Sequence, residues 1–189
     1  MNFDFYPGIE AKRKQMKGKQ KDKAPLFGKE AWQCCMHNWE TFSEAELRRI
    51  DAESVNAPFI GPAGFRYSAN SYITEDAVVV MNPHFTAIPI RDIIWIYGST
   101  VKNSVNFIPT SKDIRLNLVA RDNCSYVMLM TILTAISKKN PCQDAINTIR
   151  AKLIGKRPGI IYGYSDEIQK MRTFNFNGLV QYVDAHSVK

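Results

Sequence analysis

The side chains able to bind a metal or act as nucleophiles are few, and they gather only around Cys34, Cys35 and His37. A structural zinc site needs four ligands, usually supplied as two spaced pairs. The remaining candidates stand alone in the sequence: His84, Cys124 and Cys142. We therefore expect no metal ion and no other cofactor, and we interpret the first group as part of a buried helix.

The 4 cysteines are expected to be reduced thiols. Cys34 and Cys35 are adjacent, and neighbours seldom bridge each other because the geometry strains the peptide between them. All the cysteines lie in apolar or helical patterns, where a free cysteine behaves as a small hydrophobic residue. The sequence also has no apolar run near the roughly 20 residues of a membrane span and no signal-peptide pattern, so we predict a cytoplasmic protein.

No sequence pattern of nucleophilic catalysis or nucleotide binding is present. The chain has 3 histidines and no Gly-x-Ser-x-Gly elbow. The sequence GKRPG at 155–159 is too short for a phosphate-binding loop. We therefore predict that the protein is not an enzyme.

The strongest polar signal is a run of cations near the start. Residues 1–25 hold seven Lys or Arg and three Asp or Glu, and from residue 11 onward Met16 is their only large apolar side chain. This composition predicts a flexible basic tail over 1–25. Such a tail could simply be solvated, could attract anionic lipid at roughly 1 kcal/mol per charge, or could contact nucleic-acid phosphates. The candidate anion-binding residues are Lys12, Arg13, Lys14, Lys17, Lys19, Lys21 and Lys23.

Helices are expected on both sides of a strand-rich centre. Over 26–57, one helix has an apolar face at helical spacing, and Ser43 with Glu46 forms a capping box that begins a second helix. Pro141 begins a later helix, and Ser165 begins another near the end of the chain. The apolar face of the first helix comprises Trp32, Cys35, Met36 and Trp39.

The centre is expected to be a series of short antiparallel strands. The apolar period becomes two after residue 65, and turn-forming pairs separate the runs AVVVM, FTAIPI, IIWIYGSTV, IRLNLVAR and CSYVMLM. Six or seven such strands in succession predict a barrel or sandwich. The run IIWIY is apolar at every position, so we expect both faces of that strand to be covered, by the interior and by either the Trp32/Trp39 helix or the C-terminal helices.

Several of these stretches carry a resemblance to a known family. YITEDAVVV, IPIRDIIWIYGS, NFIPTSKDIRLNLVARD and PGIIYGYSDEIQKM resemble a bacterial family of pleckstrin-homology-like (PH-like) domains without an assigned function. A helix similar to EAELRRIDAES precedes the barrel in that family. The resemblance covers about residues 43–185 and implies no catalytic residues. It leaves out the Trp-bearing helix and the basic tail, and the segment from Met128 to Ile149 is longer than the pattern.

We therefore expect an α+β protein with a PH-like antiparallel β-barrel or sandwich of six to seven strands, closed by a C-terminal helix. The expected parts are a tail at 1–25, a helical segment at 26–57, the barrel with its helix at 58–157, and a strand and helix extension at 158–189. The expected function is protein interaction or scaffolding, and the alternative is binding of anionic membrane lipid or nucleic acid through the tail. Tyr162 and Tyr164 are candidates for a protein-binding surface or for packing against the barrel, and homo-oligomerisation stays open.

Overall fold

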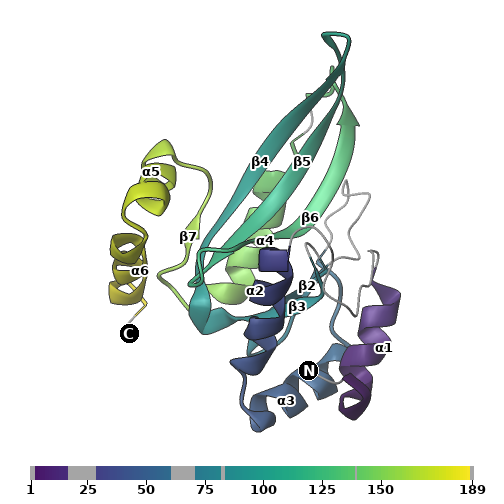
Figure 1. Ribbon diagram of the computed structural model, residues 1–189, viewed down its shortest axis with the longest axis vertical. Helices are drawn as coiled ribbons and strands as arrows, with labels where there is room; N and C mark the ends of the chain where they lie inside the picture. The colour runs from purple at the N-terminus through teal and green to yellow at the C-terminus, as the bar shows by residue number, and fades with distance from the viewer. Residues whose placement is uncertain (1–2, 17–28, 61–70, 82–83, 139, 188–189) are drawn as a thin grey trace.

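The computed structural model describes residues 3–16, 29–60, 71–81, 84–138 and 140–187, with only the backbone of 29–32 (Figure 1). None of the helices in these ranges combines the length and the apolar character that a membrane-spanning segment requires. The helices are η1 (Phe3–Phe5), α1 (Pro7–Gln15), α2 (Lys29–Glu40), α3 (Glu44–Ser54), η2 (Ile90–Asp92), α4 (Cys142–Leu153), α5 (Asp166–Phe174) and α6 (Phe176–Ala185). The strands are β1 (Ser71–Ile73), β2 (Ala77–Val80), β3 (Thr86–Pro89), β4 (Ile93–Val105), β5 (Ile108–Ala120), β6 (Ser125–Thr134) and β7 (Ile161–Tyr162).

The strands form two sheets. One has the order β1-β2-β3 and is antiparallel, and the other has the order β6-β5-β4-β7, in which β7 alone runs parallel to its neighbour. The predicted α+β class is confirmed. No backbone ladder joins the two sheets among the described strands, so a closed barrel is not formed there.

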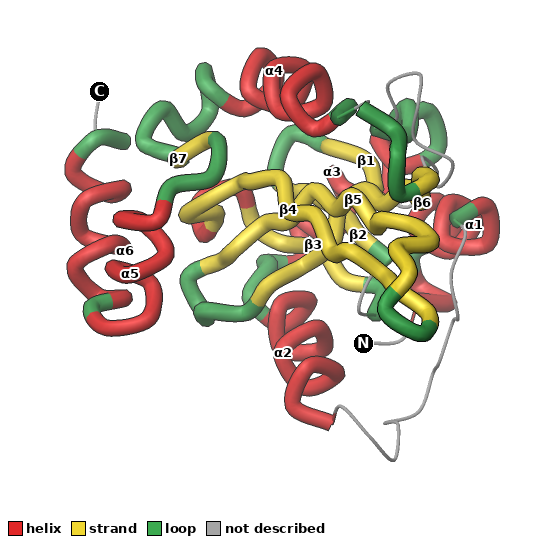
Figure 2. Tube along the Cα trace, turned by 90° about the horizontal axis from the view of Figure 1, so that it is seen from above, coloured by secondary structure: helices red, strands yellow, loops and turns green. Residues whose placement is uncertain are grey.

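The main core lies between the two sheets and α4. Alternation along β2 directs Val78 and Val80 into this core and Ala77 and Val79 to the opposite face, as the period of a strand requires. Helix α4 packs on β4 and β5. In Figure 2, α4 and α2 lie on opposite sides of the strands, and α5 and α6 lie at one end. The core residues supplied by α4 are Cys142, Ala145, Ile146, Ile149 and Leu153.

The N-terminal helices cover the second face of the small sheet. Ser43 and Glu46 form both bonds of the predicted capping box at the start of α3. Trp39 of α2 is buried against Phe85, so the Trp-bearing helix covers β3 rather than the IIWIY strand. The buried residues of this second core include Ile9, which belongs to α1.

Helix α1 occupies part of the segment expected to be a flexible tail. Ile9 has no exposed surface, and its backbone N–H donates to Asp51 Oδ1 of α3 at 2.8 Å. Gly8 allows this close approach, because a Cβ at that position would lie 2.2 Å from the Asp51 carbonyl oxygen. The expectation of a flexible tail is therefore wrong for residues 3–16, since Tyr6, Ile9 and Met16 bury apolar surface against the body.

Both faces of the IIWIY strand are covered, as predicted. Ile93 and Ile96 lie in the main core, whereas Ile94 and Trp95 pack against Leu179 and Val183 of α6. The C-terminal helices therefore supply the outer cover. The indole Nε1 of Trp95 donates to the carbonyl oxygen of Gly163 at 2.7 Å, which ties β7 and the following turn to the same strand.

Candidate functional site

The far halves of β4, β5 and β6 project from the body as three paired strands (Figure 1). The burial along β4 changes from fully buried over its first four residues to exposed at its end, and β5 shows the reverse order. We call residues 98–105, 108–115 and 130–134 of these strands the extension. Most of these residues are exposed or partly exposed, and among them only Ile114 and Thr131 are buried, so the described part of the chain encloses little of the extension.

One edge of the extension is open. β7 lies beside β4 only at Trp95 and Ile96, and the N–H of Gly163 donates to the Ile96 carbonyl oxygen at 2.9 Å. No described strand pairs with β4 on that side beyond Ile96. Because the N–H and C=O of a strand residue point to the same side and alternate along the strand, every second residue after Ile96 presents these groups to the open edge. These residues are Gly98, Thr100 and Lys102.

Aliphatic side chains line one face of the extension. The register places Val101, Asp113 and Ile132 in one row and pairs Val105 with Ile108, and paired residues share a face. The exposed fractions are 42% for Val101, 62% for Val105, 67% for Ile108 and 41% for Ile132. We call this surface the outer face of the extension. Tyr97 and Ser99 continue it toward the body, because alternate residues of β4 point to the same face of the sheet.

A strained turn ends the extension. Asn106 and Phe107 have φ values of 49° and 65°, and the side chain of Phe107 is fully exposed. A bulky residue at positive φ is uncommon, and glycine usually takes such a position in a two-residue hairpin. The turn therefore displays an aromatic ring at a conformational cost.

The structure separates the two candidate tyrosines. Tyr164 is 57% exposed, and its ring centroid lies 6.0 Å from that of Tyr97 at the base of the outer face. Tyr162 is half-buried against the main core, and burial raises the pKa of its hydroxyl to about 12. Tyr162 therefore fits the packing alternative, whereas Tyr164 adjoins the outer face.

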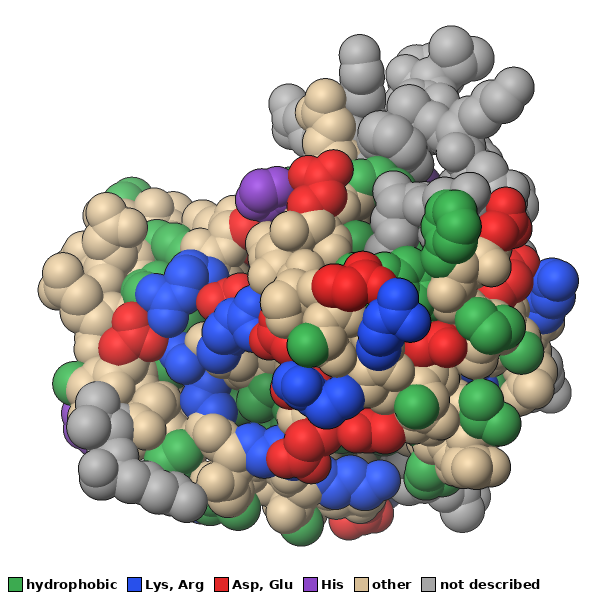
Figure 3. Space-filling model, turned by 90° about the horizontal axis from the view of Figure 1, so that it is seen from below, with side chains coloured by type: hydrophobic (Ala, Val, Ile, Leu, Met, Phe, Trp, Pro, Cys, Tyr) green, Lys and Arg blue, Asp and Glu red, His purple; other side chains and the backbone are tan. Residues whose placement is uncertain are grey.

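The described cations of the expected tail are engaged within the protein. Lys12 is buried, donates to the Ala57 carbonyl oxygen and lies 4.2 Å from the Phe59 ring centroid. Arg13 and Lys14 both contact Glu10. In Figure 3, basic and acidic side chains interleave on the face at the α3 end, where no purely basic patch is visible. The remaining candidates lie outside the described residues: Lys17, Lys19, Lys21 and Lys23.

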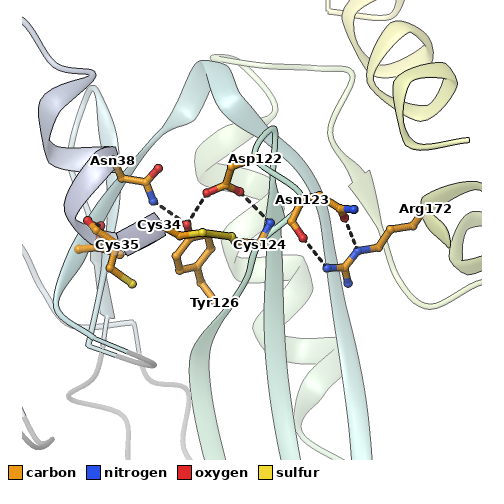
Figure 4. Close-up of a disulfide and its surroundings, with 9 residues drawn as sticks. Cys34, Cys35, Asn38, Asp122, Asn123, Cys124, Tyr126 and Arg172 are labelled. Carbon is orange, nitrogen blue, oxygen red and sulfur yellow. Dashed lines mark hydrogen bonds between the residues drawn. A yellow bond between two sulfur atoms is a disulfide. The ribbon is translucent and has the colours of Figure 1, made fainter. Parts of the chain in front are cut away.

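A disulfide joins Cys34 of α2 to Cys124 in the turn between β5 and β6 (Figure 4). The expectation of reduced thiols is therefore wrong for this pair, and it holds for Cys35 and Cys142. Burial raises the pKa of the Cys35 thiol to about 12 and that of Cys142 to about 11. These two thiols are therefore protonated at neutral pH and are poor nucleophiles.

Asp122 completes a cluster around the disulfide. Its Oδ1 accepts the Cys124 backbone N–H at 2.8 Å and its Oδ2 accepts the Tyr126 hydroxyl at 2.6 Å. The Tyr126 oxygen in turn accepts Nδ2 of Asn38 of α2 at 2.7 Å. The possible ligand atoms of Cys34, Asp122 and Cys124 all lie within 4.8 Å of one another. Sequence reasoning missed this group because Cys34 and Cys124 are 90 residues apart.

The extension was also missed in the sequence. Its only signal is the run of strand-forming residues around Val101, Val105 and Ile108, which continues well past the part of β4 that the core can bury.

Comparisons of the chain with protein-family models, with curated proteins and with solved structures find no match.

Proposed function

We propose that this chain is a non-enzymatic, PH-like protein-interaction module that binds an extended segment of a partner protein along the open edge of β4. The partner segment adds to the sheet as a further strand, and its side chains contact the outer face of the extension. Strand addition of this kind obtains affinity from main-chain hydrogen bonds and specificity from alternate side chains.

The observation that carries the proposal is the early end of β7. This strand occupies the edge of β4 at only two positions, and β4 continues to Val105 without a described neighbour on that side. An edge with unpaired N–H and C=O groups is a template for another strand. The partner segment would lie beside β4 on the same side as β7, and its pairing would begin beyond Gly163.

The outer face supports a protein as the occupant. It combines aromatic rings at the base, Tyr97 and Tyr164, with aliphatic side chains farther along, and aromatic residues are enriched in protein interfaces. Asp113 is held by Arg115 at 3.2 Å in the middle of this face, so the local charges balance and do not favour a polyanion.

The order of the elements supports the PH-like assignment. Two antiparallel arrays of consecutive strands precede α4, which packs against β4 and β5 as a C-terminal helix does in a PH-like barrel. A bacterial source and a cytoplasmic location remain predictions. The alternative function in anion binding loses Lys12, which is buried, and depends on the exposed Lys14 and on the candidates outside the described residues, Lys17, Lys19, Lys21 and Lys23. No observation of the described residues favours this alternative.

A peptide display selection tests the proposal. The intact protein is used to select binders from a library of random 12-residue peptides. Selected peptides should bind the wild type in solution and lose at least about tenfold in affinity to the Thr100→Pro variant, because proline removes an N–H that faces the open edge. The Thr100→Ala variant keeps this N–H and should bind like the wild type.

The peptides provide a second control. N-methylation at alternate peptide residues should abolish binding, because strand addition needs the peptide N–H groups. Selection of no peptide that distinguishes Thr100→Pro from Thr100→Ala would overturn the proposal. Self-association that Thr100→Pro abolishes would instead assign the edge to a second copy of the chain.

A further inference from the structure

We propose that Cys34, Cys124 and Asp122 form a redox-gated site for a thiophilic divalent cation, with Zn²⁺ as the ion that fits its ligands. The disulfide is the closed state of the site, and the reduced dithiol is the state that binds the ion. This inference is independent of the function proposed for the extension.

The geometry requires little movement on reduction. Zinc holds thiolate sulfur at about 2.3 Å and carboxylate oxygen at about 2.0–2.2 Å, so ligand atoms in a tetrahedral site lie roughly 3.5 Å apart. Three protein ligands leave the fourth position of such a site to a water molecule, unlike a structural site with four protein ligands. The three ligand atoms here already lie within 4.8 Å of one another. Both cysteines are half-buried and Asp122 is exposed, so an ion can enter from solvent while the sulfur atoms stay partly shielded.

The ligands are supported from both sides. The hydrogen bonds of Asp122 to Tyr126 and to the Cys124 N–H orient its carboxylate, and Asn38 holds the Tyr126 hydroxyl (Figure 4). Outer partners of this kind position metal ligands and raise affinity. On the other side of the turn, Arg172 of α5 donates to Asn123 Oδ1 at 2.9 Å and to the Asn123 carbonyl oxygen at 2.8 Å. The turn is therefore anchored before any ion binds.

The charge at the site favours a cation. No ion pair engages Asp122 within the described part of the chain. Two thiolates beside this carboxylate would bring three negative charges together, and a divalent cation offsets most of that charge.

The chemistry balances as a two-electron exchange. A small-molecule dithiol reductant supplies two electrons and two protons, the S–S bond breaks, and the reductant leaves as its own disulfide. Binding of Zn²⁺ to the two thiols then releases two protons to solvent. Reoxidation by a disulfide such as oxidised glutathione restores the bond between Cys34 and Cys124 and expels the ion.

Cobalt titration of the intact chain tests the inference. The protein is reduced, freed of reductant without oxygen, and titrated with Co²⁺, whose absorption reports thiolate coordination. We expect one equivalent to bind, with thiolate-to-cobalt bands that Zn²⁺ displaces. The oxidised chain should bind none, and Tyr126→Phe should weaken binding by about 10- to 100-fold, as loss of an outer partner does.

Substitutions assign the ligands. Cys34→Ser and Cys124→Ser should each abolish the bands, whereas Cys142→Ser, a buried thiol elsewhere, should leave them unchanged. Asp122→Asn should weaken binding, and circular dichroism verifies folding of each variant. Bands that persist without Cys34 or Cys124 would overturn the inference, as would their absence from the reduced wild type. If a serine variant fails to fold, equal binding by the oxidised and reduced wild type still refutes it, because these differ only by two electrons and two protons.

Discussion

Replacement of Ile9 by alanine tests whether the start of the chain is part of the folded body. Ile9 has no exposed surface and lies in the core formed by α1, α2, α3 and the small sheet. The change removes three buried carbons at about 0.8 kcal/mol each and leaves a cavity. We therefore expect a loss of about 2.5–4 kcal/mol in the free energy of unfolding.

Urea unfolding followed by circular dichroism measures this loss through the midpoint and slope. In a thermal scan the same change should lower Tm by roughly 5–15 °C for a chain of this size. Lys14→Ala is the matched control on the same helix, since Lys14 is 71% exposed and makes only a 3.6 Å contact with Glu10. The control should lose no more than about 0.5 kcal/mol. A loss of similar size for Ile9→Ala would refute the packing of α1 and restore the tail interpretation.

Two further changes test the core and the C-terminal helices. Gly98→Ala should lower the free energy of unfolding by about 1–3 kcal/mol, because the new Cβ would lie 2.8 Å from Cys142 Cβ. In urea unfolding, the double variant with Cys142→Gly should recover part of this loss. Additive losses from the two substitutions would contradict the contact. Hydrogen bonds from Arg121 and then Arg157 lower the pKa of Asp184 in the folded protein. The ionised Asp184 therefore stabilises the folded state fully at pH values above its unfolded pKa of about 4, and this contribution is lost as the pH falls through the lower folded pKa. Asp184→Asn should therefore lose about 1–2 kcal/mol at pH 7 and show a weaker acid dependence in pH-dependent unfolding, and an unchanged pH profile would exclude this role.

Local patterns predicted the local structure well. The capping box at Ser43 and Glu46 forms as expected because its two bonds join residues three apart in the chain. The unbroken apolar run of the IIWIY strand predicted that both of its faces are covered. Successive side chains of a strand point to opposite faces, so a run that is apolar at every position has two apolar faces to bury. The outer cover of this strand comes from Leu179 and Val183 of α6, which are fully buried.

The errors concern contacts between distant segments. The composition of residues 11–25 suggested a tail, but α1 is ordered by Ile9 and by the backbone contact of Gly8 with α3, which lies more than 40 residues later. The pairing of Cys34 with Cys124 likewise depends on α2 packing beside the β5–β6 turn. The spacing of residues within one segment cannot predict either contact, because each contact joins segments that are far apart in the chain.

The sequence by itself determined the α+β class, most helix and strand positions and the burial of the central strand, because periodicity and capping act over a few neighbouring residues. Tertiary structure alone decided which edge of β4 stays open, which cysteines meet and which lysine is buried. These outcomes depend on how far each strand extends beyond the core and on which element packs beside it. They depend on which residues lie close together in space, and the separation of those residues along the chain does not determine this.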